Sequence, residues 1–123
     1  MLYLVGAGIY DTFEMCNSTS ILKSCDRIYL ESFTSPISDK FIDTLKTTLG
    51  PGKKIEFVKR WFVEDGRQIL DESKTLDVGL ISYGDPTIAT TFTELRIRAI
   101  KNNIDVKVIH AASGITSLVG ECG

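Results

Sequence analysis

Short apolar segments alternate with longer segments of helical pattern along the whole chain. This alternation is typical of a parallel β-sheet whose strands are connected by helices. No internal repeat, low-complexity tract or interdomain linker interrupts it, so we expect residues 1–123 to form a single α/β domain. The pattern predicts five strands, at Leu2–Val5, Arg27–Glu31, Ile55–Val58, Val78–Ser82 and Val106–His110.

The first, fourth and fifth predicted strands are apolar almost throughout. Strands that helices cover on both faces have this composition. We therefore expect these three strands at the centre of the sheet. The side chains expected in the middle of the core are Leu4, Leu80, Ile81, Val108 and Ile109.

Two predicted helices begin with a polar residue followed by proline. Ser35-Pro36 places a capping side chain before a proline at the first helical position, and Gly50-Pro51 ends the helix. Apolar residues four apart support this helix, at Ile37, Phe41, Leu45 and Leu49.

Asp85-Pro86 repeats the start signal directly after the fourth strand, and Asn102-Asn103 ends that helix. Its apolar face holds Ile88, Phe92, Leu95 and Ala99. Two further helices are expected, at Arg67–Ser73 and within Phe13–Ser24.

Composition and charge exclude several classes of protein. With 43% hydrophobic and 24% charged residues, the chain is not disordered. Fourteen basic and sixteen acidic residues give a net charge of -2, whereas nucleic-acid-binding domains usually carry a positive excess. We therefore expect no nucleic-acid partner.

The cysteines predict neither disulfides nor a metal site. Cys16, Cys25 and Cys122 are odd in number and widely spaced, and His110 is the only histidine. This usage favours a reducing, cytoplasmic location. The apolar segment Met1–Tyr10 is too short to span a bilayer and has no basic residue before it, so we expect no signal peptide and no membrane partner.

Loops of small residues follow the three most apolar strands. They are Gly6–Asp11, Gly84–Ile88 and Ala111–Ile115. Ligands of open parallel sheets bind beyond the carboxyl ends of the strands, where small residues let them approach the backbone. The three loops therefore predict one ligand pocket.

The first of these loops does not identify the ligand. Gly6-x-Gly8 lacks the third glycine of a dinucleotide fingerprint, because Asp11 stands there, and no phosphate-binding G-K-[ST] follows. A nicotinamide cofactor is disfavoured. A tight turn from strand to helix is the structural alternative for these glycines.

Three polar residues of the other two loops have competing interpretations. Asp85 precedes a proline as a helix cap does, yet one of its two oxygens could face a sulfonium or ammonium group. His110 is interpreted as a hydrogen-bonded residue of the core or the pocket wall rather than a catalyst. Ser113 lacks the G-x-S-x-G frame of a hydrolase, so a serine hydrolase is disfavoured.

An aromatic pair stands beside a small basic cluster. The cluster is interpreted as a solvated surface, because acidic residues balance it. Trp61 and Phe62 are hard to solvate together, so we expect one of them to pack on another domain, another subunit or a lid.

Five blocks of the sequence together match the pattern of one known family. The blocks are Leu2–Asp11, Tyr29–Ser35, Gly84–Thr91, Leu95–Ala99 and Val108–Ala111. On these blocks the chain resembles the diphthine synthases, a methyltransferase family of the tetrapyrrole-methylase superfamily. The Gly84-Asp85-Pro86 loop is typical of the superfamily, whereas the Ala-Thr-Thr segment that ends at Thr91 and the Glu-Ser-Phe-Thr-Ser segment are typical of the diphthine synthases.

The resemblance implies both a fold and an activity. The fold is a five-stranded parallel sheet of order 3-2-4-1-5, flanked by helices. The activity is transfer of methyl groups from S-adenosylmethionine to the amino group of a modified histidine on translation elongation factor 2, in diphthamide biosynthesis. A precorrin-type tetrapyrrole methyltransferase of the same superfamily is the nearest alternative.

The resemblance also implies a set of cofactor contacts but no catalytic residue. An inserted Gly114 leaves open which of two residues follows Ser113 in that set, and Phe92 stands where the family commonly has histidine. The expected contacts are Ile9, Asp85, Ile88, Ser113 and Gly114 or Ile115.

The family's enzymes have a second domain of similar size that closes the cofactor cleft. Residues 1–123 resemble the N-terminal domain alone, so we expect the isolated chain to fold without catalysing transfer. A non-catalytic binding or assembly domain is the alternative for a chain of this length. Uncovered apolar surface favours a homodimer, as in the family.

Overall fold

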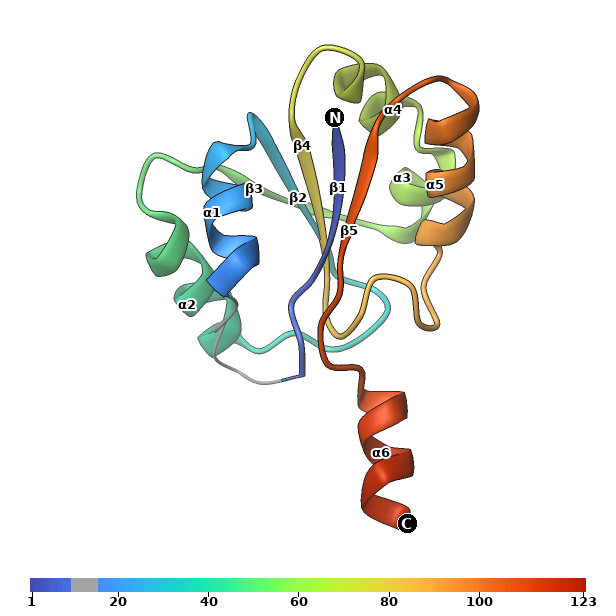
Figure 1. Cartoon of the computed structure of the whole chain (residues 1–123). Coiled ribbons are helices and arrows are strands. Elements are labelled where there is room, and N and C mark those ends of the chain that lie inside the picture. Colours follow the sequence, from blue (N-terminus) through green and yellow to red (C-terminus); the bar gives the residue numbers. More distant parts are fainter. Residues whose placement is uncertain (10–15) are drawn as a thin grey trace.

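The computed structural model describes residues 1–9 and 16–123, and its centre is one sheet of five parallel strands. The strand order is β3-β2-β4-β1-β5, as the resemblance implies, and Figure 1 shows the strands running side by side. The predicted strands agree with the structure to within one residue at each end. They are β1 (Leu2–Gly6), β2 (Arg27–Glu31), β3 (Ile55–Val58), β4 (Val78–Ser82) and β5 (Val106–Ile109).

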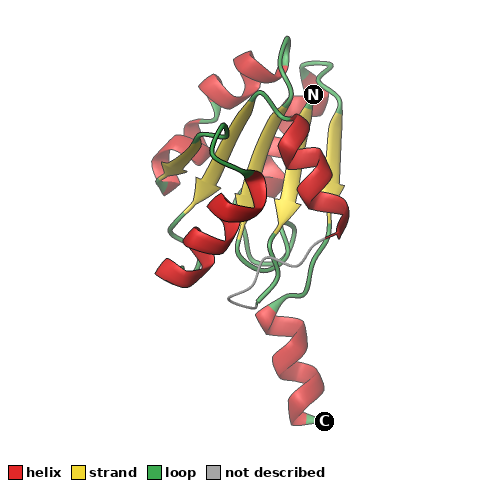
Figure 2. Cartoon of the chain, turned by 90° about the vertical axis from the view of Figure 1, so that its left-hand side faces the viewer, coloured by secondary structure: helices red, strands yellow, loops and turns green. Residues whose placement is uncertain are grey.

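Helices cover both faces of the sheet (Figures 1 and 2). On one face lie α1 and α2, and on the other lie α3, α4 and α5, whereas α6 extends away from the sheet. The prediction at Arg67–Ser73 is confirmed, and two helices, α3 and α6, were not predicted. The helices are α1 (Cys16–Ser24), α2 (Asp39–Leu49), α3 (Arg60–Asp65), α4 (Arg67–Ser73), α5 (Phe92–Lys101) and α6 (Gly114–Cys122). The helix predicted within Phe13–Ser24 is confirmed as α1, and residues 13–15 of that range lie outside the described residues.

The core forms two layers, one on each face of the central strands. Leu4 and Leu80 pack toward α3, α4 and α5, while Ile81 packs toward α1 and α2, and all three are buried. The central position predicted for β5 is wrong, because β5 is an edge strand whose one partner among the described strands is β1. Val108 and Ile109 are therefore only partly buried.

The start predicted for α2 at Ser35-Pro36 is wrong by three residues. Ser38, with extended backbone, is the cap, and its Oγ accepts a hydrogen bond from the Phe41 N–H at 3.1 Å. The residues between β2 and Ser38 cross from the sheet to the helix layer. Because α2 starts only after this crossing, the hydroxyl within reach of its first free N–H groups is that of Ser38.

The helix start predicted at Asp85-Pro86 is also wrong. Residues 85–91 form turns, and α5 begins only at Phe92. Ala89 has a φ of 54°, a left-handed conformation that interrupts any helix passing through it. The predicted end is confirmed, since Asn102 caps the carboxyl end of α5.

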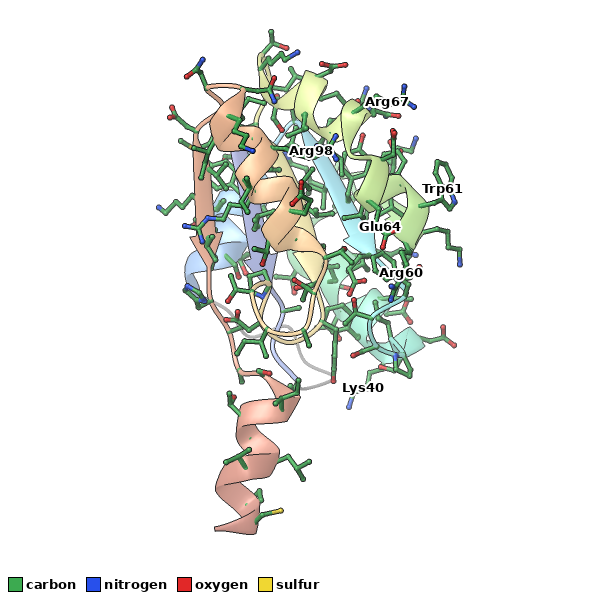
Figure 3. All side chains as sticks on the ribbon, turned by 90° about the vertical axis from the view of Figure 1, so that its right-hand side faces the viewer. Lys40, Arg60, Trp61, Glu64, Arg67 and Arg98 are labelled. Carbon is green, nitrogen blue, oxygen red and sulfur yellow. The ribbon has the colours of Figure 1, made fainter. Side chains whose placement is uncertain are left out.

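The aromatic pair divides between core and surface. Phe62 packs on Tyr29, with ring centroids 5.3 Å apart, whereas Trp61 is 69% exposed and points away from α3 (Figure 3). Arg98 on α5 donates to the carbonyls of Glu64 and Asp65 and so fixes the end of α3. No helix in the described part of the chain is long and apolar enough to cross a membrane.

Candidate functional site

Two loops meet backbone to backbone at the carboxyl end of the central strands. Gly8 and Gly84 form an isolated antiparallel bridge, with N to O distances of 3.2 and 2.7 Å. A Cβ at Gly6 would lie 2.7 Å from the Gly84 oxygen and 2.8 Å from the Ala111 Cβ. Gly6 therefore permits the loops after β1, β4 and β5 to approach one another, which a tight turn alone would not require.

A pocket of about 320 Å³ opens where these loops converge. The loops after β1, β4 and β5 all contribute to it, as predicted. The loop after β2 contributes as well, because β2 is the neighbour of β4 in the sheet. The described lining residues are Ile9, Thr34, Ser35, Tyr83, Gly84, Ile88, Ala89, Ser113, Gly114 and Ile115.

The pocket brings together five of the six residues predicted as cofactor contacts. Both candidates for the shifted contact, Gly114 and Ile115, are on its wall. A Cβ built on Gly114 would meet only the Ile9 side chain, at 3.9 Å, so the inserted glycine leaves space there. Asp85 is the sixth residue, and it lies behind the lining rather than on it.

The Asp85 carboxylate is buried and accepts four hydrogen bonds. Oδ1 accepts from the N–H and hydroxyl of Thr87, at 2.8 and 2.6 Å. Oδ2 accepts from His110 Nδ1 at 2.8 Å and from the Ala111 N–H at 3.1 Å. Burial acts to raise the pKa of Asp85, but these four hydrogen bonds outweigh it and hold the pKa below its usual value of 3.8.

This geometry shows what Asp85 does in the free protein. A carboxylate has about four acceptor positions, and four donors of the chain itself occupy them. Asp85 is thus neither a helix cap nor a carboxylate with an oxygen left over for a cation. It ties the loop after β4 to the loop after β5.

His110 and Ser113 each form a hydrogen bond with another residue of the loops around the site. The His110 side chain is 68% exposed, and its hydrogen bond to Asp85 agrees with the prediction of a hydrogen-bonded residue, though not one in the core. Ser113 is buried, and its Oγ accepts from the Ile115 N–H at 3.3 Å as the cap of α6.

Sequence reasoning missed Thr34, Ser35 and Tyr83. The strand order could have indicated the first two, because residues that follow β2 must reach the same edge of the sheet as those that follow β4. Tyr83 directly follows β4, and its hydroxyl donates to the carbonyl of Ile9, which also lines the pocket. This contact joins two lining residues that are 74 positions apart.

Comparison with known proteins agrees with this arrangement. The model of one protein family, described as tetrapyrrole (corrin/porphyrin) methylases, matches residues 1–122. The chain belongs to the tetrapyrrole methylase family. Within the family it is similar to a crystal structure of a diphthine synthase, with a TM-score of 0.86 and 26% identity over 97% of this chain and 47% of the other.

Curated relatives of the methylase family cover the whole chain. The diphthine synthase of Methanothermobacter thermautotrophicus is 32% identical, and the diphthine methyl ester synthase of Saccharomyces cerevisiae is 38% identical. These matches confirm the resemblance found in the sequence. The chain spans 46% and 41% of the length of these two relatives.

Proposed function

We propose that this chain is the cofactor-binding half of an S-adenosylmethionine-dependent methyltransferase, a diphthine synthase. The substrate would be the modified histidine of translation elongation factor 2, methylated on its amino group in diphthamide biosynthesis. The observation that carries the proposal is the pocket at the carboxyl end of the sheet. Loops after four strands converge there, and the family's cofactor-contact positions fall on or directly behind its wall.

The lining suits the cofactor chemically. Ile9, Ile88 and Ile115 supply apolar surface for an adenine ring and a methionine chain. Gly84, Ser113 and Gly114, which have small side chains or none, let a ligand approach the backbone of the wall closely. In this proposal Asp85 acts as a positioning residue, because its hydrogen bonds hold two of the lining loops together.

The bound cofactor would supply the methyl group, and the protein would supply orientation. Methyl transfer is an in-line displacement at the carbon of a sulfonium, so the main requirement is to hold the nucleophile in line. An amine that arrives neutral needs no dedicated base. We accordingly assign no catalytic residue in this chain.

The acceptor atom distinguishes the close alternatives. Some relatives are named diphthine methyl ester synthases, and a methyl ester forms on a carboxylate oxygen rather than on an amine. A precorrin-type tetrapyrrole would offer a ring carbon instead. Methyl transfer assays with unmodified-amine elongation factor 2, and with a precorrin, separate the protein from the ring when the polypeptide used is as long as the relatives. Alkali then separates the two acceptor atoms on the protein, because it cleaves a methyl ester and leaves a methylated amine intact.

Binding to the chain itself tests the cofactor site. We expect calorimetry to detect weak binding of S-adenosylhomocysteine, and Ile88→Asp to abolish it by placing a charge on the apolar wall. Ile97→Asp, at an exposed position on α5, is the matched control and should leave binding unchanged. Equal binding by the two variants would exclude the pocket as the cofactor site.

A second domain is part of the proposal. Residues 1–123 would form the N-terminal domain, and a C-terminal domain would close the cleft and complete the contacts. The isolated chain should then bind the cofactor without turnover. Methylation of elongation factor 2 by the chain alone, at the rate of the longer polypeptide, would overturn this requirement and with it the two-domain proposal.

Self-association and a cytoplasmic location complete the proposal. Large apolar side chains are exposed on several elements, among them Phe57 of β3, Trp61 of α3 and three residues of α6. Such surface favours a homodimer. Analytical ultracentrifugation that finds only monomer would exclude the dimer.

A further inference from the structure

A second buried carboxylate stands directly behind the pocket wall. Glu31 ends β2 and is 0% exposed. Its Oε2 accepts from the Thr34 N–H at 3.1 Å and from the Thr34 hydroxyl at 2.8 Å. Thr34 lines the pocket, so the Glu31 carboxylate is hydrogen-bonded directly to a residue of the pocket wall.

The other oxygen of Glu31 is unsatisfied. Oε1 is buried and has no hydrogen-bond partner among the described residues. Ser82, the last residue of β4 as Glu31 is the last residue of β2, also has a buried hydroxyl without a partner among the described residues. Asp85, by comparison, has donors at both oxygens.

No cation of the described structure is paired with Glu31. The described pocket lining contains no lysine, arginine or histidine, and residues 10–15 contain none in the sequence. Arg60 contacts the same loop, but its guanidinium lies over the Phe33 ring at 5.4 Å and pairs with Glu64 at 3.8 Å. A buried negative charge without a counter-ion is costly, and a positive charge in the adjoining pocket would offset that cost.

We propose that Glu31 is a positioning residue that acts through Thr34 to make the pocket favour a ligand with a positive charge. Two effects contribute. The Thr34 hydroxyl donates its only hydrogen to Glu31 and can therefore act toward a ligand only as an acceptor. The carboxylate behind it adds a negative potential that water does not screen.

The inference rests on the proposed function and narrows it. In a methyltransferase the positive charge would come from the sulfonium at the transferred methyl group or from the ammonium of the methionine part. Glu31 would stabilise either charge in the ground state, and it would not touch the reacting atoms.

The test compares ligands that differ in charge, with Glu31→Gln as the variant. Glutamine retains an oxygen that can accept from Thr34, and it removes the charge. Calorimetry measures the affinity of each protein for four ligands: S-adenosylmethionine, S-adenosylhomocysteine, sinefungin and methylthioadenosine. Sinefungin places an ammonium near the position of the sulfonium, S-adenosylhomocysteine has a neutral sulfur, and methylthioadenosine lacks the amino-acid part.

We expect Glu31→Gln to reduce the preference for a charged ligand by about five- to tenfold. A reduced preference for S-adenosylmethionine and sinefungin over S-adenosylhomocysteine assigns the effect to the sulfonium. A reduced preference for S-adenosylhomocysteine over methylthioadenosine assigns it to the methionine ammonium. If both preferences stay at the wild-type value, the inference is overturned.

Two controls separate this result from damage to the fold. Glu72→Gln alters a carboxylate of α4 that accepts a hydrogen bond from the Tyr29 hydroxyl. The helix α4 lies near the amino ends of the strands, away from the pocket, so this variant should leave every ratio of ligand affinities unchanged (Figure 1). Amide hydrogen exchange at Thr34 should show its protection retained in Glu31→Gln. A wild-type chain that binds none of the four ligands refutes the proposed function and this inference together, whereas wild-type binding with unchanged ratios refutes the inference alone.

Discussion

The loops after β4 and β2 contain the same local hydrogen-bonding arrangement, but it has a different structural role in each. In each, a buried carboxylate accepts from the N–H and hydroxyl of a nearby threonine, Thr87 for Asp85 and Thr34 for Glu31. The second oxygen of Asp85 reaches the β5 loop, about 25 residues away, whereas that of Glu31 finds no partner among the described residues. One carboxylate therefore joins two loops and the other holds only its own.

This difference predicts which loop determines the geometry of the site. The Asp85 hydrogen bonds connect the loops after β4 and β5, so their loss should let these two loops move apart. The Glu31 hydrogen bonds stay within the loop after β2, so their loss should change only the charge behind the pocket and the wall that this loop forms. Four measurements test this contrast, and the largest expected effect comes first.

The largest effect is expected for Asp85→Ala compared with Glu31→Ala. The first variant leaves four donors without their acceptor and should lower the free energy of unfolding by about 3 kcal/mol. The second removes an incompletely bonded charge and should cost about 1 kcal/mol or less. Urea denaturation measures both, and equal losses would contradict the contrast between the two loops.

The next effect concerns the close approach of the loops at Gly6. Gly6→Ala places a Cβ within 2.9 Å of the Gly84 oxygen, the Ala111 Cβ and the Pro86 Cδ. The resulting separation should cost about 2 kcal/mol and weaken S-adenosylhomocysteine binding. Gly52→Ala is the control, because nothing lies within 4 Å of its Cβ and its φ is not in the left-handed region. Similar stability of the two variants would show that the loops do not depend on Gly6.

A smaller effect is expected where the β2 loop joins α2. Ser38→Ala removes the cap of α2 and should cost about 1 kcal/mol, because the Phe41 N–H loses its acceptor. Ser35→Ala, at the residue that the sequence pattern favours as the cap, should leave stability nearly unchanged. Thermal unfolding of both variants measures the two losses of stability. A larger loss in Ser35→Ala than in Ser38→Ala would mean that Ser35 caps the helix, as the sequence pattern predicts.

The smallest effect is a pH dependence of stability due to Asp85. Its pKa is lower in the folded protein than the usual value of 3.8, so the folded state favours the ionised form. The stabilisation is complete above the unfolded pKa and is lost as the pH falls through the folded pKa. Denaturation below about pH 4 should show a shallower decline for Asp85→Asn than for wild type. Parallel curves would mean that ionisation of Asp85 does not stabilise the fold.

The strands, and the end of the sheet where the pocket forms, could be predicted from the amino-acid pattern alone. A strand that is buried in a sheet needs a short run of apolar residues, and such runs are visible in the sequence itself. For this reason β1 to β5 were predictable. Loops of small residues after parallel strands predicted the pocket for the same reason. The strand order came only from resemblance, because local pattern does not specify which strands pair.

The roles of the polar residues in those loops depend on three-dimensional contacts that the amino-acid pattern does not reveal. Asp85 and Ser35 both precede a proline, yet neither caps a helix, since hydrogen-bond partners distant in sequence or the path of the chain determine their positions. β5 is apolar like a central strand but lies at an edge, because pairing depends on the whole sheet. Burial without a counter-ion at Glu31 likewise arises from the packing of several segments. A carboxylate's partners are a property of three-dimensional proximity, and spacing along the chain does not contain it.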